Sequence, residues 1–169
     1  MVKNISKQSP SEFYKLAGIE YFDFEEDFIE ENVRCIPMIV RFKMDAAGIK
    51  LKLSEWSKFK SNERIELAIK PCSSEEDARE YSSYLSVLVT KYTNKAATVM
   101  EINQQPAWAD LANIPVLLQE KAQEFKWQIA KEQWSGLTNL QRFALIKLYR
   151  PGHENKNFPK AMKEFGIAE

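Results

Sequence analysis

The fold class follows from residues 36–67, which read IPMIVRFKMDAAGIKLKLSEWSKFKSNERIEL. These residues align without a gap with residues 114–145, which read IPVLLQEKAQEFKWQIAKEQWSGLTNLQRFAL. Seven of the 32 aligned positions are identical, and they include an Ile-Pro pair and a Trp-Ser pair. Self-similarity at a fixed spacing is typical of a repeated supersecondary unit that packs against its copy. The sequence therefore predicts two diverged copies of one unit.

Both copies have the pattern of helices. Pro37 and Pro115 suit the first turn of a helix, where the missing N–H costs nothing, and apolar residues follow them at helical spacing. Gly48 predicts a left-handed cap after the first helix. Residues 49–53 alternate in polarity, so we expect an extended stretch or a strained helical bridge there. No glycine interrupts residues 116–134, so the second copy is expected to form one continuous helix in this region.

The remaining segments are also predicted to be helical. Ser74 and the acidic residues after it resemble the start of a capped helix that runs to about Asn94, and Pro159 begins a last helix. Residues 95–106 are the best candidate for a linker. The prediction is an all-α fold of seven to nine helices without strand pairing. It comprises a flexible N-terminal arm at 1–20 and a single domain at 21–169, whose pseudo-duplicated halves are 21–94 and 107–169.

Composition and charge narrow the class of protein. The 169 residues carry 24 basic and 24 acidic side chains, whereas proteins that bind nucleic acid usually have a basic excess. No run approaches the roughly 18 apolar residues of a transmembrane helix, and the first ten residues, MVKNISKQSP, lack the apolar segment of a secretory signal. Two cysteines are too few for a disulfide framework. We therefore expect a cytoplasmic protein that binds neither nucleic acid nor membrane.

The sequence contains few groups that could perform catalysis. His153 is the one histidine, and with Cys35 and Cys72 it supplies too few ligands for a recognisable metal site. Motifs for phosphate binding or nucleophilic catalysis are missing, so we expect a protein without enzymatic activity and without a cofactor. Two alternatives stay open. A pterin- or nucleotide-type cofactor could stack on Trp56 and Trp134, or Cys35 near a helix start could make a thiol-dependent redox protein.

Charge is unevenly distributed along the first half of the chain. Residues 20–31 carry seven acids and no base, whereas residues 34–70 carry nine bases and four acids. Opposite charges of this kind steer association and select partners. Either the two segments pair with each other inside the molecule, or one of them meets a partner.

Three stretches resemble the nitrate-reductase-associated protein family. The most specific is residues 22–56, FDFEEDFIEENVRCIPMIVRFKMDAAGIKLKLSEW; the others are residues 142–158, RFALIKLYRPGHENKNF, and the terminal KEFG at 163–166. The resemblance covers about residues 21–167 and supplies no catalytic residues to carry over.

This resemblance implies association with assimilatory nitrate reductase, an enzyme with a molybdenum cofactor and iron–sulfur clusters. The chain is then expected to be a chaperone-like accessory or maturation factor that binds the reductase or its molybdenum-cofactor delivery machinery. The candidate partner-binding residues form two groups along the chain: Arg34, Cys35, Arg41, Lys43 and Lys50 in the first, and Arg142, Arg150, His153 and Asn155 in the second.

Overall fold

A computed structural model describes residues 10–14, 16–29 and 35–169, and this part of the chain is mostly helical, as predicted. The chain divides into two compact units, unit 1 at Met1–Met100 and unit 2 at Glu101–Glu169, and each predicted half lies within one of them. The α-helices are α1 (Met38–Ala47), α2 (Leu53–Trp56), α3 (Ser61–Ile69), α4 (Glu75–Thr93), α5 (Val116–Glu124), α6 (Lys131–Gly136), α7 (Asn139–Leu148) and α8 (Phe158–Glu164). The 3-10 helices are η1 (Asp23–Ile29), η2 (Ala107–Ala109) and η3 (His153–Asn157).

Unit 1 also contains a small antiparallel sheet. Strand β1 (Ile49–Lys50) pairs with β2 (Thr98–Val99), with Ile49 opposite Val99. The prediction that no strands pair was therefore wrong, and the expected linker at 95–106 supplies β2. The cause is local, because Gly48 ends α1 in the left-handed region at φ 68° and turns the chain into the extended stretch that the alternating sequence predicts.

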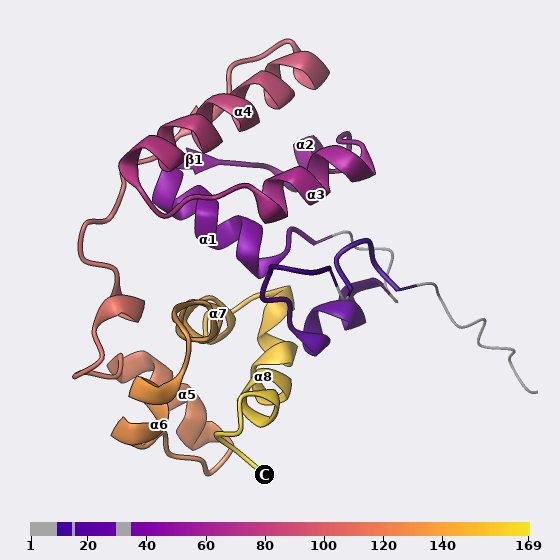
Figure 1. The fold of residues 1–169 in the computed structure, drawn as a ribbon. Helices are drawn as coiled ribbons and strands as arrows, with labels where there is room; N and C mark the ends of the chain where they lie inside the picture. Colours follow the sequence, from indigo (N-terminus) through magenta and orange to yellow (C-terminus); the bar gives the residue numbers. More distant parts are fainter. Residues whose placement is uncertain (1–9, 15, 30–34) are drawn as a thin grey trace, which may run out of the picture. The chain divides into compact units, whose positions relative to one another are not determined.

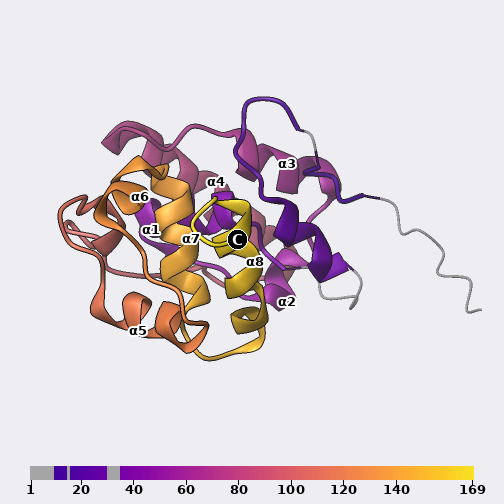
Figure 2. The same cartoon turned by 90° about the horizontal axis from the view of Figure 1, so that it is seen from below.

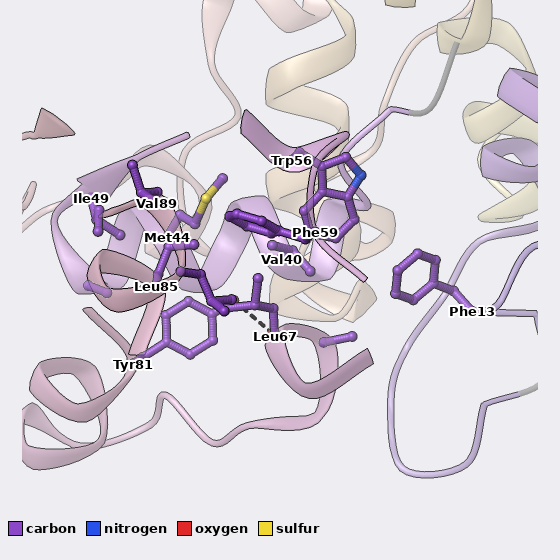
Figure 3. Packing of buried hydrophobic residues seen from close by; sticks show 13 residues of the cluster. Phe13, Val40, Met44, Ile49, Trp56, Phe59, Leu67, Tyr81, Leu85 and Val89 are labelled. Atoms are coloured by element: carbon purple, nitrogen blue, oxygen red, sulfur yellow. Dashed lines mark hydrogen bonds between the residues drawn. The ribbon is translucent and has the colours of Figure 1, made fainter. Parts of the chain in front are cut away.

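The core of unit 1 forms where α4 packs against α1, as the violet and magenta helices of Figure 1 show. Tyr81 also donates a hydrogen bond of 2.7 Å to the carbonyl of Leu67, which fastens α3 to α4 (Figure 3). The predicted start and end of α4 are confirmed, since Ser74 caps its first turn and Asn94 ends it in the left-handed region. The buried side chains of this core are Val40, Met44, Ala47, Ile49, Trp56, Phe59, Leu67, Ala68, Tyr81, Leu85, Leu88 and Val89, with Phe13 from the N-terminal segment.

Unit 2 breaks its helix where a continuous one was expected. Helix α5 ends at Glu124, Lys126 adopts φ 62°, and α6 begins only at Lys131. The extended stretch between the helices is held by Gln119, whose side chain bonds both the N–H and the carbonyl of Ile129, at 3.0 and 2.7 Å. The prediction of one helix through residues 116–134 was therefore wrong. Farther along unit 2, α7 and α8 lie side by side in Figure 1 and in Figure 2.

The elements of unit 2 begin at the positions that the sequence alignment pairs with those of unit 1. The left-handed residues that follow the first helix of each unit are also aligned: Gly48 comes directly after α1 at φ 68°, and Lys126 comes two residues after the end of α5 at φ 62°. The aligned starts are Met38 and Val116 for α1 and α5, Leu53 and Lys131 for α2 and α6, and Ser61 and Asn139 for α3 and α7. The two units therefore share a helix–turn–helix–helix order over these residues.

Candidate functional site

Each unit contains a buried arginine over a buried tryptophan at aligned positions. In unit 1 the guanidinium carbon of Arg64 lies 5.6 Å from the ring centroid of Trp56, and in unit 2 Arg142 lies 5.9 Å from that of Trp134. Such cation–π contacts are stronger when water is excluded, and all four side chains are buried. The two tryptophans are thus core anchors. Stacking of a pterin or nucleotide would need an open ring face, which neither ring has in this structure.

Arg142 uses its donors inside unit 2. Its Nε donates to the carbonyl of Trp108 at 2.7 Å, and Nη1 donates to the carbonyls of Trp134 and Leu137. Its Nη2 donates to the side-chain oxygen of Asn139. Burial lowers the pKa of the guanidinium. The side chain thereby ties the η2 segment to the junction of α6 and α7, so the structure places this predicted partner-binding residue in the core.

Arg64 binds its surroundings differently, although it is aligned with Arg142. Its Nε and Nη2 donate to the carbonyls of Trp56 and Ser57, at 3.3 and 3.1 Å. Its Nη1 donates to the carboxylate of Glu12 at 3.3 Å, and the neighbouring Phe13 stacks on Trp56 with 6.1 Å between ring centroids. The site in unit 1 therefore holds side chains that come from the predicted N-terminal arm.

Lys43, another candidate for partner binding, is half-buried and also has a structural role. Its Nζ donates to the carbonyls of Ala68 and Lys70 at 2.6 and 2.7 Å, where α3 ends. Burial lowers the pKa of this ammonium group. Burial likewise raises the pKa of the Cys72 thiol, which donates to the carbonyl of Lys43. A raised pKa favours the thiol over the thiolate, which is the nucleophilic form.

The other candidates of the first group are placed less centrally. Arg41 is half-buried, with Nη1 3.9 Å from the sulfur of Met38, and Cys35 is half-buried as well. Arg34 lies outside the described residues. Lys50 is exposed on β1 and belongs to a run of exposed lysines that continues to the start of α3. We call this run the basic surface: Lys50, Lys52, Lys58 and Lys60.

Three of the second group of candidates follow the end of α7, whereas Arg142 lies near its start. The amide nitrogen of Asn155 donates to the carbonyls of three successive residues, 148, 149 and 150, at 3.2 to 3.3 Å. Asn155 therefore caps a helix end, whereas Arg150 is exposed. His153 begins η3, and its side chain is outside the described part of the structure. Arg142 is the buried member of the group, so these residues do not form one exposed patch.

Part of the acidic segment at 20–31 caps backbone groups rather than facing a partner. Glu25 is buried, and its carboxylate accepts hydrogen bonds from the N–H groups of Met38 and Phe22, at 2.7 and 3.0 Å. It thus satisfies an otherwise unpaired donor at the start of α1. Glu26 accepts from the N–H of Ser11 at 3.1 Å. Sequence reasoning missed this cap because the usual capping residues lie within three positions of the helix start.

Glu63 is a second buried carboxylate with several donors. It accepts hydrogen bonds of 2.8 Å from the Nζ of Lys91, the hydroxyl of Tyr92 and the N–H of Lys60. Burial alone would raise the pKa of Glu63, but these donors lower it further than burial raises it. The residue therefore links α3 to the end of α4 while it is charged.

We expect Glu63→Gln to lower the free energy of unfolding at pH 7 by about 1 kcal/mol, a modest value because Lys91 is half-exposed and screened by solvent. The folded-state pKa of Glu63 is depressed, so its stabilisation is present above the unfolded pKa of about 4.3 and is lost as the pH falls through the folded pKa. Urea unfolding at pH 7 and at a pH below about 4 should therefore show the difference between variant and wild type shrinking. Glu80→Gln, at an exposed position of α4, is the control. An equal difference at both pH values would contradict the interpretation.

Membrane-spanning helices and candidate metal-binding clusters are both missing from the part of the chain that the structure describes. Within this part of the chain, no helix is both long enough and apolar enough to cross a membrane. In the same residues, no group of three or more histidine, cysteine, aspartate or glutamate side chains could hold a metal ion.

The fold defines a mostly helical protein of two compact units, each built around a buried arginine–tryptophan pair. Residues 21–165 match the family described as conserved nitrate reductase-associated protein, and the chain belongs to that family. The resemblance that the sequence motifs indicate is thereby confirmed. Neither a curated protein nor a solved structure matches the chain.

Proposed function

We propose that the chain is a non-enzymatic accessory or maturation factor in the cytoplasm, where it binds assimilatory nitrate reductase or its molybdenum-cofactor delivery machinery. The observation that carries this proposal is membership of the nitrate reductase-associated family over residues 21–165. In a chaperone-like role, the helical scaffold would hold the immature reductase in a state that accepts its cofactor. The partner is a protein, and no nucleic acid or membrane is involved.

The exposed lysines of the basic surface are the residues of unit 1 that best fit such a partner. These four lysines are exposed, whereas the cations of Lys43 and Arg64 are used within the unit. Exposed charges accelerate association and select partners of opposite sign. The reductase or delivery protein is therefore expected to present carboxylates to this surface. We do not include Arg142 and Asn155 among the proposed partner-binding residues, because both already donate hydrogen bonds to main-chain carbonyls.

We expect the triple substitution Lys50→Glu, Lys52→Glu, Lys58→Glu to abolish co-purification of nitrate reductase and molybdenum-cofactor proteins from cells grown on nitrate. Reversing the charge of three exposed lysines replaces attraction to an acidic partner by repulsion. Affinity purification with mass spectrometry measures the loss, and the free energy of unfolding should stay within about 0.5 kcal/mol per substitution.

The matched control reverses three exposed lysines of unit 2, Lys131, Lys160 and Lys163. This variant has the same change in net charge and is expected to retain the partners. If the unit 1 variant still retained the partners, the binding site would lie outside the basic surface. An eluate of the wild-type protein without any of these partners, repeated after crosslinking, would overturn the proposed function itself.

We also propose that the two units descend from one duplicated helical unit. Three observations support this origin: the aligned helix starts, the aligned left-handed residues Gly48 and Lys126, and the aligned arginine–tryptophan pairs. A left-handed lysine is uncommon, because a side chain there costs roughly 1 kcal/mol or more. Its position opposite a glycine is therefore hard to explain by chance. Duplication gives each unit an arginine–tryptophan pair at the same position, and the residues that contact the two pairs differ.

A further inference from the structure

Residues 11–13 of the N-terminal segment lie at the site around Trp56 and Arg64 and make three kinds of side-chain contact. The hydroxyl of Ser11 lies 3.0 Å from that of Tyr21, and Glu12 accepts a hydrogen bond from Arg64 at 3.3 Å. The ring of Phe13 is 5% exposed and stacks on Trp56. Figure 3 shows Phe13 reaching the core from a segment separate from the helices that supply the other side chains. The site thus binds a carboxylate side chain and the aromatic ring of the residue that follows it.

The aligned site of unit 2 is filled in another way. The Nε of Arg142 binds the main-chain carbonyl of Trp108 at 2.7 Å, and the indole nitrogen of Trp134 donates to that of Asp110 at 2.8 Å. Every residue carries a main-chain carbonyl, so this site recognises the course of the chain rather than a sequence. In the site of unit 1, by contrast, the contacts of Glu12 and Phe13 depend on which side chains arrive.

The occupying segment is also weakly attached compared with the site that holds it. Residues 11–13 contact α2 and α3 through the Phe13 ring on Trp56 and the ion pair of Glu12 with Arg64, in which the Glu12 side chain is 27% exposed. Their other contacts, from Ser11 to Glu26 and from Ser11 and Phe13 to Tyr21, stay within the N-terminal segment. Partly exposed ion pairs contribute little, and ordering the segment costs conformational entropy. Trp56 and Arg64, by contrast, belong to α2 and α3, so helices of unit 1 position the side chains of the site. The side chains of the site are thus positioned by helices, whereas the occupant reaches these helices through two side chains, Glu12 and Phe13.

We infer that the Trp56–Arg64 site is a recognition site for an acidic residue followed by Phe or Tyr, that residues 11–13 occupy it in the isolated chain, and that a partner segment of the same chemistry displaces them. The occupant supplies the carboxylate to Arg64 and the ring to Trp56. This inference does not depend on which protein the chain assists, so it stands or falls separately from the proposed function.

The test uses the full-length chain and a fluorescent peptide of residues 8–16, QSPSEFYKL. In the double variant Glu12→Gln, Phe13→Ser the internal segment cannot compete, so the peptide should bind at least about tenfold more tightly than it binds the wild type. Fluorescence anisotropy measures both affinities. A peptide carrying the same two substitutions should not bind either protein. Tyr14→Ser in the full-length chain is the control, because it removes an exposed neighbouring ring. The peptide should bind this variant with the same affinity as it binds the wild type.

Equal peptide affinities for the double variant and the wild type, or no binding to either, would overturn the inference. A second measurement on the wild type covers the case in which the variant does not fold. Amide hydrogen exchange of residues 10–14 should be at least about 100-fold faster than that of α4, because an exchangeable segment opens without global unfolding. Equal exchange rates would show that the segment is a fixed part of the core.

Discussion

Replacing Arg142 with methionine is expected to lower the free energy of unfolding by about 3 to 5 kcal/mol. Methionine keeps much of the apolar length of the side chain but has no hydrogen-bond donor. The carbonyls of Trp108, Trp134 and Leu137 would then lose a donor in a buried site, where an unpaired polar group is costly. Urea unfolding followed by tryptophan fluorescence measures the change.

The control for this substitution is Arg150→Met, which removes an exposed guanidinium only two residues after α7 ends. It should change the free energy of unfolding by no more than about 0.5 kcal/mol. Hydrogen exchange should locate the damage caused by Arg142→Met, with the earliest loss of protection around η2. A loss of less than about 1 kcal/mol would mean that water reaches these carbonyls and replaces the guanidinium.

Local residues explain which parts of the fold the sequence predicts well. Ser74 and Thr138 cap helices through their own side chains, and Gly48 supplies the left-handed residue after α1. Each signal acts within one turn of the helix end that it determines. The local sequence therefore predicts these helix ends independently of the rest of the fold.

The errors occur where the cause is distant in sequence or has no residue signature. Lys126 breaks the helix in unit 2 although lysine favours helices, and the break is stabilised by the bonds of Gln119 to Ile129, ten residues farther along. Strand β2 consists of two exposed residues, Thr98 and Val99, whose pairing depends on β1 from the middle of the unit. Periodicity contains no information on either contact.

The candidate site illustrates a different limit, because charge alone does not distinguish an exposed cation from a buried one. Lys43 and Lys50 are equally basic in sequence, yet the first bonds the end of α3 and the second is exposed. One useful signal was available. Arginine follows tryptophan by eight residues in both aligned copies, at Trp56 and Arg64 and again at Trp134 and Arg142, and a pair kept in both copies is more consistent with the core than with a partner surface.

Trp56→Ala is expected to lower the free energy of unfolding by about 3 to 5 kcal/mol, the usual range for removing a fully buried tryptophan. The ring is 1% exposed and contacts Phe59 edge-on at 6.2 Å, besides carrying Arg64 and Phe13 on its faces. Alanine leaves a cavity that helices α2 and α3 cannot close fully. Chemical denaturation monitored by circular dichroism measures the loss, and Trp56→Phe, which retains an aromatic ring, should lose clearly less.

A double-mutant cycle separates two effects of Trp56→Ala: the cavity that the substitution leaves, and the loss of the ring on which Phe13 stacks. If Phe13 is held chiefly by its stacking on Trp56, then Phe13→Ser should destabilise the wild type but have little further effect in the Trp56→Ala background. Residues in contact commonly show coupling of 0.5 kcal/mol or more, roughly, whereas independent residues add. Additive effects would mean that Tyr21, whose ring lies 6.0 Å from that of Phe13, retains the segment without Trp56. The recognition site would then be centred on Tyr21 and Ser11 rather than on the arginine–tryptophan pair.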